Sequence, residues 1–249
     1  MTMAEGAPLL AMEGIEKSFP GVYALKGVRL DLHRGEVLAV VGENGAGKST
    51  LIKVLAGVHA PDAGAITIDG VARRFANPLE AQRAGIAVIY QEFNLIPGLT
   101  VQENILLGHE KARFGFFSPK EERQTTEALF ARMRIHIDPS AVCATLSVAQ
   151  QQLVEIAKAL SLGARILVMD EPSAALTNQE VDTLFAIIRD LQAQGIGIIY
   201  ISHRLNEIFA IADRVTVLRD GAYIDTRPVA DVNREALIEM MVGRSIDNE

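Results

Sequence analysis

The 249-residue sequence predicts an α/β fold with a mostly parallel central sheet. Short apolar runs alternate with amphipathic stretches, the pattern of buried parallel strands that are covered by helices. Apolar residues make up 49% of the chain and charged residues 22%, which is ordinary for a globular protein. The length allows a sizeable core, in one large domain or one domain with two lobes.

The predicted buried strands are the apolar runs 36–42, 165–170 and 195–202. Two Asp-Gly pairs, Asp69-Gly70 and Asp220-Gly221, lie between β-rich segments. Because Asp-Gly is a strong signal for a tight hairpin turn, we expect an antiparallel portion beside the parallel core.

Helix starts are marked by capping boxes, in which a hydroxyl residue precedes a Glu by three positions. The pairs are Thr100 with Glu103, Ser118 with Glu121, and Thr177 with Glu180. After Thr177 a core-packed helix ending near Gly195 is expected, with this apolar face: Val181, Leu184, Phe185, Ile188 and Leu191. Ser147 is placed to cap another helix, whose apolar residues recur at Leu153, Ile156, Ala157 and Leu160.

The stretch from about 93 to 161 shows several helices and no strong strand. We expect a helical lobe of about 93–161, inserted into a core lobe of about 1–92 and 162–249, all within one domain of residues 1–249. Low-complexity linkers and convincing internal repeats are absent from the sequence.

Charge and cysteine content restrict the class of protein. The 24 Lys and Arg against 31 Asp and Glu give a net charge of -7, which argues against broad nucleic-acid binding. Cys143 is the single cysteine, so an internal disulfide is excluded and a reducing compartment is favoured. Apolar runs fall well short of the roughly 18 residues of a membrane span, and the start of the chain lacks a secretion signal. We therefore expect a soluble, cytosolic chain.

A phosphate-binding loop follows the first predicted strand. The loop fits the pattern G-x-x-x-x-G-K-[ST] and leads into a helix, as nucleotide binding requires. Its backbone N–H groups and the helix start would hold phosphates, Lys48 would neutralise the β- and γ-phosphates, and Ser49 would offer its hydroxyl to Mg²⁺. The alternative, a glycine-rich turn that binds nothing, fits this context less well. The loop comprises Gly42, Glu43, Asn44, Gly45, Ala46, Gly47, Lys48, Ser49 and Thr50.

Asp170 and Glu171 end the predicted strand 165–170. Open α/β sheets bind ligands beyond the carboxyl ends of their strands, so these carboxylates should lie near the phosphate loop. Asp170 suits Mg²⁺ through water, and Glu171 suits polarising an attacking water. A solvated strand end is the alternative interpretation.

His203 follows the strand 195–202 and would reach the γ-phosphate or the attacking water. Gln91 also follows an apolar run and is a weaker candidate for contacting Mg²⁺ or the water. Phe19 lies 23 residues before Gly42 and is a candidate for stacking on adenine, although taken alone a core aromatic is the better interpretation. The remaining histidines are expected to be surface or packing residues: His33, His59, His109 and His136.

In this order the elements resemble the ATP-binding cassette (ABC) ATPases over nearly the whole chain. The family pattern maps onto Phe19, the loop 42–50, Gln91, the signature at 146–150, the Asp170-Glu171 pair, the loop 173–177 and His203. The resemblance implies a P-loop NTPase fold with a RecA-like parallel-sheet core, an antiparallel β subdomain and an inserted helical subdomain. It also implies Mg²⁺-dependent hydrolysis of ATP to ADP and phosphate.

More closely, the chain is similar to the amino-terminal half of the ATPase subunits of bacterial monosaccharide importers, of the ribose, xylose, arabinose and galactose type. The similar stretches include "YQEFNLIPGLTVQENILLG", "QQLVEIAKAL", "ISHRLNEIFAIADRVTVLRDG" and "LIEMMVGR". Subunits of that group usually hold two cassettes. One cassette is found here, so we expect a fragment, with a single-cassette relative as the alternative.

In the family, two cassettes meet head to tail, and the signature of one covers the γ-phosphate that the other holds. The resemblance therefore implies a second nucleotide-binding domain as partner, and it implies nucleotide contacts from Ser147, Ala149 and Gln150. Val148 and Ala149 stand where glycines are usual, and Thr177 stands where many cassettes carry Asp. The anion would be held by backbone N–H groups, by the positive end of the helix and by the Ser147 hydroxyl. None of these contacts requires glycine, so we expect the anion site to survive.

The resemblance further implies permease subunits and, indirectly, a sugar-binding protein, which places the chain on the inner face of the cell membrane. Candidate permease-contacting residues are Phe93, Asn94, Leu95 and Ile96; packing within the helical lobe is an equal alternative. Two other functions stay open: an ABC-type ATPase that is not coupled to transport, and a non-hydrolytic nucleotide sensor. A generic P-loop GTPase is disfavoured because no N-K-x-D stretch is found.

Overall fold

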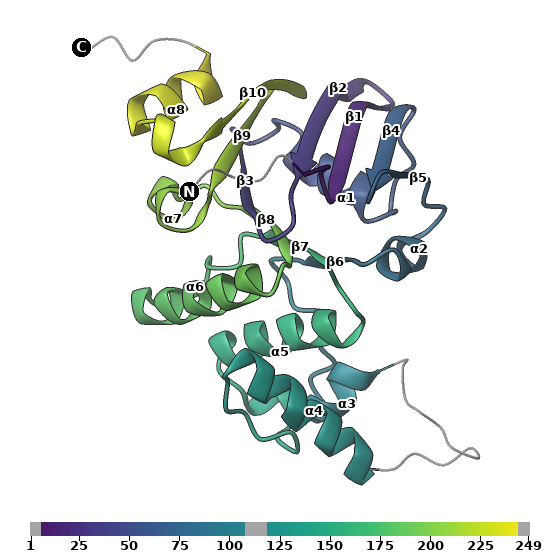
Figure 1. The fold of residues 1–249 in the computed structure, drawn as a ribbon, viewed down its shortest axis with the longest axis vertical. Coiled ribbons are helices and arrows are strands. Elements are labelled where there is room, and N and C mark those ends of the chain that lie inside the picture. The colour runs from purple at the N-terminus through teal and green to yellow at the C-terminus, as the bar shows by residue number, and fades with distance from the viewer. Residues whose placement is uncertain (1–5, 108–118, 244–249) are drawn as a thin grey trace.

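The computed structural model describes residues 6–107 and 119–243, which form two sheets and their covering helices (Figure 1). The larger sheet has six strands in the order β10-β9-β3-β8-β7-β6. The smaller sheet has four strands in the order β2-β1-β4-β5. The strands are β1 (Leu10–Phe19), β2 (Val22–Leu32), β3 (Val37–Val41), β4 (Ala63–Ile68), β5 (Val71–Arg73), β6 (Ile86–Ile89), β7 (Ile166–Asp170), β8 (Gly197–Ile201), β9 (Arg214–Arg219) and β10 (Ala222–Pro228).

The larger sheet is parallel except at its β9–β10 edge. Its central strand β3 is buried along its whole length and pairs with β8 and β9. Leu38 and Val40 pack toward the smaller sheet and α1 (Lys48–Leu55), whereas Val37, Ala39 and Val41 pack toward the helices on the other face. Two buried faces explain why these strands read as continuous apolar runs. The α/β prediction and the three predicted strands are confirmed.

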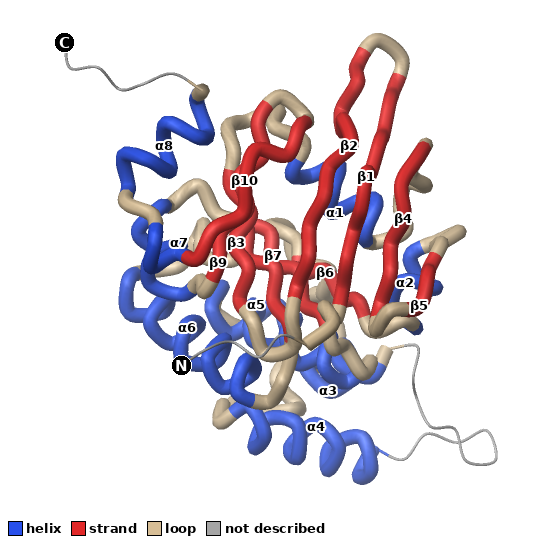
Figure 2. The backbone as a smooth tube through the Cα atoms, turned by 45° about the horizontal axis from the view of Figure 1, so that its top comes forward, coloured by secondary structure: helices blue, strands red, loops and turns tan. Residues whose placement is uncertain are grey.

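The smaller sheet is antiparallel, and its longest pair is the β1–β2 hairpin, which is prominent in Figure 2. This hairpin was not expected from the sequence. Its register shifts at three places, so regular alternation of apolar residues is broken. The turn at Pro20-Gly21, where Gly21 has φ 79°, was the available signal.

Both Asp-Gly pairs form the predicted hairpins. Asp69 and Gly70 have φ of 50° and 74°, and Asp220 and Gly221 have φ of 52° and 79°, as a type I′ turn requires at both central residues. The first turn joins β4 to β5, and the second joins β9 to β10. The second hairpin therefore belongs to the edge of the large sheet and not to the smaller antiparallel sheet.

The remaining helices are α2 (Pro78–Arg83), α3 (Val101–Leu106), α4 (Pro119–Met133), α5 (Val148–Ser161), α6 (Asn178–Ala193), α7 (Leu205–Ile211) and α8 (Arg234–Val242). Capping boxes at Thr100 and Thr177 are confirmed at the starts of α3 and α6. Ser147 caps α5, with Gln150 in the place of the usual Glu. The predicted cap at Ser118 lies outside the described residues.

Helices α3, α4 and α5 pack together at the end of the molecule away from the smaller sheet (Figure 1). Asn104 is fully buried there and fixes the preceding loop. Its amide oxygen accepts from the Ile96 N–H, and its NH₂ group donates to the Ile96 carbonyl and, at 3.2 Å, to the Cys143 sulfur. The division into two lobes at about 93 and 161 stays a prediction. Within the described ranges, no helix combines the length and hydrophobicity that crossing a membrane requires.

Candidate functional site

A pocket of about 770 Å³ lies at the carboxyl ends of β3, β7 and β8. Parallel pairing places these three strand ends along one edge of the sheet, so residues far apart in sequence meet there. Eleven of the candidate residues line this pocket: Phe19, Asn44, Gly45, Gly47, Lys48, Ser49, Thr50, Gln91, Asp170, Glu171 and His203.

The phosphate loop needs glycine at two positions for steric reasons. A Cβ on Gly42 would lie 2.3 Å from the Leu218 carbonyl oxygen. Gly47 has φ 100°, and a Cβ there would lie 2.9 Å from the Ala24 carbonyl oxygen. Gly42 and Ala46 are buried behind the loop, and these two residues and Glu43 do not line the pocket. Gly47 also caps α1, whose positive end faces anions that enter the loop.

The Lys48 ammonium lies over the loop. Its Nζ donates hydrogen bonds to the carbonyl oxygens of Gly42, at 2.6 Å, and Glu43, at 3.0 Å. Burial lowers the pKa of Lys48, and the negative charges of Glu171 and Asp170 oppose that shift. A half-buried cation with two carboxylates nearby suits the binding of a polyanion together with a divalent cation.

Asp170 and Glu171 occupy different environments at the end of β7. Burial raises the pKa of Asp170, the Glu171 charge raises it further, and Lys48 lowers it. Glu171 has φ 51°, which is uncommon for a residue with a side chain. Its N–H donates to the Ile201 carbonyl at 2.9 Å, which fixes its backbone against the end of β8.

His203 meets Glu171 across the two loops. The His203 Nδ1 lies 2.9 Å from the Glu171 Oε2, which is an ion pair if the imidazole is protonated. The Oε2 atom is buried, and no hydrogen bond to it from the described residues is found beside this contact. A carboxylate and an imidazole held this close at the pocket can act together on a bound molecule.

The predicted Mg²⁺ ligands carry oxygen donors, which are the donors this ion prefers. Ser49 offers a hydroxyl, Asp170 a carboxylate and Gln91 an amide oxygen, and all three line the same pocket. The described part of the chain contains no group of three or more His, Cys, Asp or Glu arranged to hold a metal. These few donors fit an ion that completes its coordination with phosphate oxygens and water.

The signature residues are not brought to this pocket. Ser147, Val148, Ala149 and Gln150 lie at the start of α5 and are absent from its lining. The Ser147 Oγ accepts from the Gln150 N–H at 3.2 Å, and the Val148 side chain is 41% exposed. Thr177 likewise caps α6 away from the pocket. The mouth of α5 therefore faces outward, where another molecule can contact it.

Phe19 is only partly buried and belongs to neither core cluster, so the core interpretation of this residue is wrong. Its ring meets that of His59 edge to face, at 5.1 Å between centroids, and the Lys17 ammonium lies 5.6 Å from the ring. Tyr23, 47% exposed, lines the same pocket and was missed. Tyr23 stands in no recognisable motif, so the sequence gave no distinguishing signal for it.

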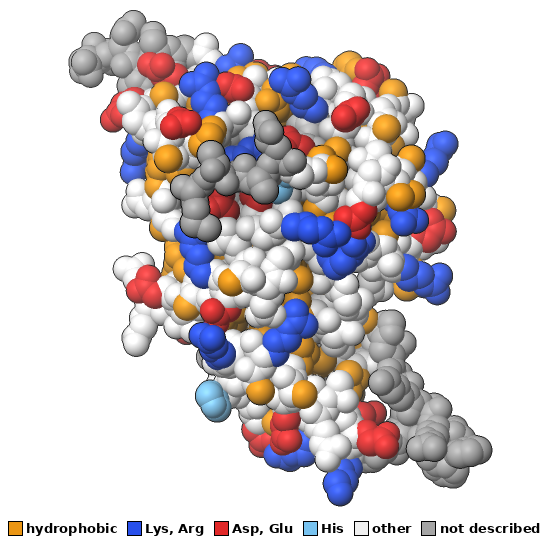
Figure 3. Space-filling view, in the orientation of Figure 1, with side chains coloured by type: hydrophobic (Ala, Val, Ile, Leu, Met, Phe, Trp, Pro, Cys, Tyr) orange, Lys and Arg blue, Asp and Glu red, His pale blue; other side chains and the backbone are white. Residues whose placement is uncertain are grey.

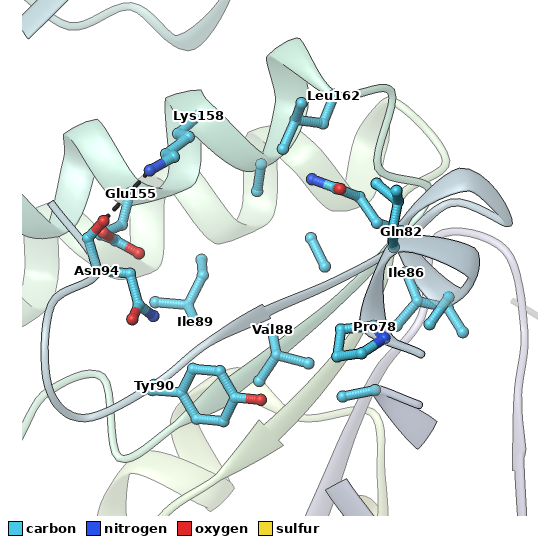
Figure 4. A pocket seen from close by; sticks show the side chains of 15 residues that line it. Pro78, Gln82, Ile86, Val88, Ile89, Tyr90, Asn94, Glu155, Lys158 and Leu162 are labelled. Carbon is cyan, nitrogen blue, oxygen red and sulfur yellow. Dashed lines mark hydrogen bonds between the residues drawn. The ribbon is translucent and has the colours of Figure 1, made fainter. Parts of the chain in front are cut away.

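A second pocket, of about 300 Å³, lies between α2, β6 and α5 (Figure 4). The residues 93–96 do not act as one surface: Asn94 lines this pocket, Ile96 is 44% exposed, Leu95 is buried, and Phe93 packs against the core. Figure 4 shows Lys158 reaching from α5 to the Asn94 carbonyl, a hydrogen bond of 3.2 Å. The core interpretation therefore holds for Leu95, and Asn94 is the member of the group that opens onto a pocket.

Comparisons with known proteins agree with this geometry. A family model described as "ABC transporter" matches residues 25–174. The "Putative ribose/galactose/methyl galactoside import ATP-binding protein 2" of Burkholderia cenocepacia (strain HI2424) is 55% identical over 244 residues, covering 97% of this chain and 48% of that protein. The "Ribose import ATP-binding protein RbsA 2" of the same strain is 54% identical over 241 residues, covering 96% of this chain and 48% of that protein.

Solved structures resemble this fold over nearly its full length. The "ADP conformation of MJ1267, an ATP-binding cassette of an ABC transporter" has a TM-score of 0.83 and 27% identity, covering 96% of this chain and all of that one. The "Dimeric Structure of MJ0796, a Bacterial ABC Transporter Cassette" has a TM-score of 0.74 and 27% identity, covering 88% and 98%. The chain spans about half the length of the curated relatives it matches. It has the P-loop NTPase fold of these cassettes, and it belongs to the ABC transporter family.

Proposed function

We propose that this chain binds ATP and hydrolyses it to ADP and phosphate with Mg²⁺, as the ATP-binding part of a subunit that drives monosaccharide uptake through an ABC transporter. The observation that carries the proposal is the meeting of Lys48, Ser49, Asp170, Glu171 and His203 in one pocket. The sugar is proposed from the names of the relatives, which are ribose and galactose import ATP-binding proteins.

The residues divide the chemistry among them. The loop N–H groups and Lys48 hold the phosphates, and Phe19 offers an aromatic surface for the base. The Glu171 carboxylate accepts a hydrogen bond from the attacking water, which it orients and polarises, while His203, with its Nδ1 2.9 Å from Glu171 Oε2, reaches the γ-phosphate. Ser49, Asp170 and Gln91 would hold Mg²⁺, which neutralises charge on the phosphate oxygens when bound.

The outward position of the α5 mouth supports a head-to-tail pair of cassettes. The pocket that holds Lys48 lacks Ser147, Ala149 and Gln150 of its own chain, so a second nucleotide-binding domain would supply them. The helix start and its Ser147 hydroxyl would then stabilise the γ-phosphate of the neighbouring site.

The isolated chain should therefore bind ATP but turn it over slowly, at a rate per molecule that rises with protein concentration. Each site is incomplete until two chains meet, and phosphoryl transfer depends on complete electrostatic stabilisation. ATP affinity at low protein concentration and hydrolysis over a hundredfold concentration range test this. Rapid hydrolysis that is independent of concentration would refute the shared site.

Replacing Val148 and Ala149 together by glycine in the complete subunit should change the ATPase rate less than about tenfold. The anion contacts come from backbone N–H groups and Ser147, and both departures are compatible with the first turn of α5. Glycine destabilises a helix by up to about 1 kcal/mol relative to alanine and by less relative to valine, so rates are compared per folded molecule after measuring thermal unfolding. A hundredfold gain in rate would show that Val148 and Ala149 impair the site.

We propose the pocket between α2, β6 and α5 as the contact for a permease subunit, with the sugar-binding protein acting through the permease. Asn94 joins this pocket to the loop that follows Gln91, and Lys158 joins it to α5. Movement at the nucleotide can thus reach the permease through short connections. This partner would hold the chain on the inner face of the membrane.

The two alternative functions are less well supported. In Figure 3, blue and red side chains are mixed over the visible face, with no broad basic surface such as an ATPase acting on nucleic acid would use. Glu171 and His203 both line the pocket, and these residues suit hydrolysis. The geometry therefore favours an ATPase over a nucleotide sensor that does not hydrolyse ATP. Both alternatives predict that a permease leaves the ATPase rate unchanged.

A further inference from the structure

Glu207, in α7, is a buried carboxylate at the centre of a hydrogen-bond network behind the pocket. It is 7% exposed and accepts hydrogen bonds from three hydroxyl groups. Ser173 Oγ lies 2.7 Å from Oε1 and 2.6 Å from Oε2, Tyr200 OH lies 2.8 Å from Oε2, and Ser202 Oγ lies 3.1 Å from Oε2. All three donors are themselves fully or almost fully buried.

These donors belong to the two segments that carry Glu171 and His203. Ser173 follows Glu171 by two residues, in the loop between β7 and α6, and Ser202 directly precedes His203 at the end of β8. Arg204 strengthens the junction: its guanidinium donates to Glu207 Oε1 at 3.3 Å and to the Ser173 carbonyl at 3.4 Å. Glu207 therefore bonds to both segments at once.

Both oxygens of the Glu207 carboxylate accept hydrogen bonds in this network. Three hydroxyl groups and a guanidinium donate to it, and burial together with the Glu207 charge raises the pKa of Tyr200 far above its usual value. A glutamine offers one acceptor oxygen, and its NH₂ group would have to donate where hydroxyl groups now donate. The exchange of Glu207 for Gln keeps the volume of the side chain but not the pattern of hydrogen bonds.

We propose that Glu207 is a positioning residue for hydrolysis, which sets the placement of Glu171 relative to His203 without touching the nucleotide. Glu207 does not line the pocket that holds Lys48, so it acts through Ser173 and Ser202. The 2.9 Å approach of His203 to Glu171 spans the two segments that Glu207 joins. The inference rests on the proposed ATPase function of this site.

The first test compares Glu207→Gln with Glu36→Gln in the full chain. Glu36 is a matched control because it is also a buried carboxylate, 2% exposed, that accepts from the His33 N–H at 2.6 Å and from Arg214 at 3.1 Å. It precedes β3, at the amino end of that strand, whereas the pocket lies at the carboxyl ends. Both variants should lower the melting temperature. Because small misplacement of reacting groups is costly, Glu207→Gln should lower kcat about tenfold or more, with KM changed less than about threefold. Glu36→Gln should leave both constants within about twofold per folded molecule.

The second test measures the imidazole ¹⁵N resonances of His203 by NMR in protein labelled at histidine. These resonances are identified by their loss from the spectrum of a His203→Gln variant. Glu207→Gln should move the resonances that Glu171→Gln also moves, and Glu36→Gln should not. If Glu207→Gln does not fold, Ser173→Ala removes one donor and should move the same resonances. Unmoved His203 resonances, or equal kcat in the Glu207 and Glu36 variants, overturn the inference. A wild-type chain without ATPase activity contradicts the proposed function instead, and the resonances still decide the role of Glu207.

Discussion

Replacing Glu171 by glutamine should lower the rate of ATP hydrolysis by about a thousandfold while leaving the affinity for ATP nearly unchanged. Glutamine fills the same space, but a neutral amide replaces the carboxylate that is proposed to polarise the attacking water. The phosphate contacts of Lys48 and the loop stay in place. The rate is measured by phosphate release and the affinity by calorimetry, with Mg²⁺ present in both.

The same variant should form a stable dimer with Mg²⁺ and ATP, because hydrolysis no longer separates the two chains. Light scattering with and without ATP measures this association. Glu239→Gln, the same chemical change at an exposed position of α8, should hydrolyse ATP like the wild type and show no added stability of the dimer. A Glu171→Gln protein that stays monomeric with Mg²⁺ and ATP would falsify the shared-site arrangement.

Replacing Lys48 by glutamine should weaken ATP binding about 10- to 100-fold, because a charge-assisted hydrogen bond to phosphate contributes about 1.5–3 kcal/mol. Without nucleotide the change should cost little stability. Burial disfavours the Lys48 charge, as its lowered pKa shows, and a glutamine amide can also donate to the loop carbonyls. Calorimetric titration with ATP and thermal unfolding measure the two effects.

Lys53→Gln is the matched control for Lys48→Gln. Lys53 lies in the same helix α1, but it is exposed and does not line the pocket. Both variants replace a lysine by glutamine, so they change the net charge equally. Its ATP affinity should stay within about twofold of the wild type, because exposed charges at a distance are screened by salt. Equal losses of affinity in the two variants would show that Lys48 contributes only long-range charge.

The sequence was informative where a functional residue follows an apolar run. Asp170 ends the buried parallel strand β7, Glu171 follows it directly, and His203 lies two residues beyond the end of β8. Parallel topology brings such strand ends together. The phosphate loop was also readable, because its glycines, lysine and hydroxyls are adjacent in the chain. Local patterns of this kind predict which residues meet, although they do not test what those residues do.

Contacts between distant segments were not predictable where no local pattern marks the residues. Glu207 sits in the amphipathic stretch "SHRLNEIF", where a glutamate is usually a solvated residue, and its partner Ser173 is 34 positions away. Bulges hid the β1–β2 hairpin from a search for regular alternation. Tyr23 reaches the pocket only because that hairpin folds beside the phosphate loop.

The left-handed backbone of Glu171 has a consequence for heat resistance. A side chain in this conformation costs of order 1 kcal/mol or more, which glycine avoids and asparagine reduces. Glycine or asparagine at position 171 would therefore raise the thermostability of the chain. Under the proposed function, durability and catalytic power therefore place opposite demands on a single residue.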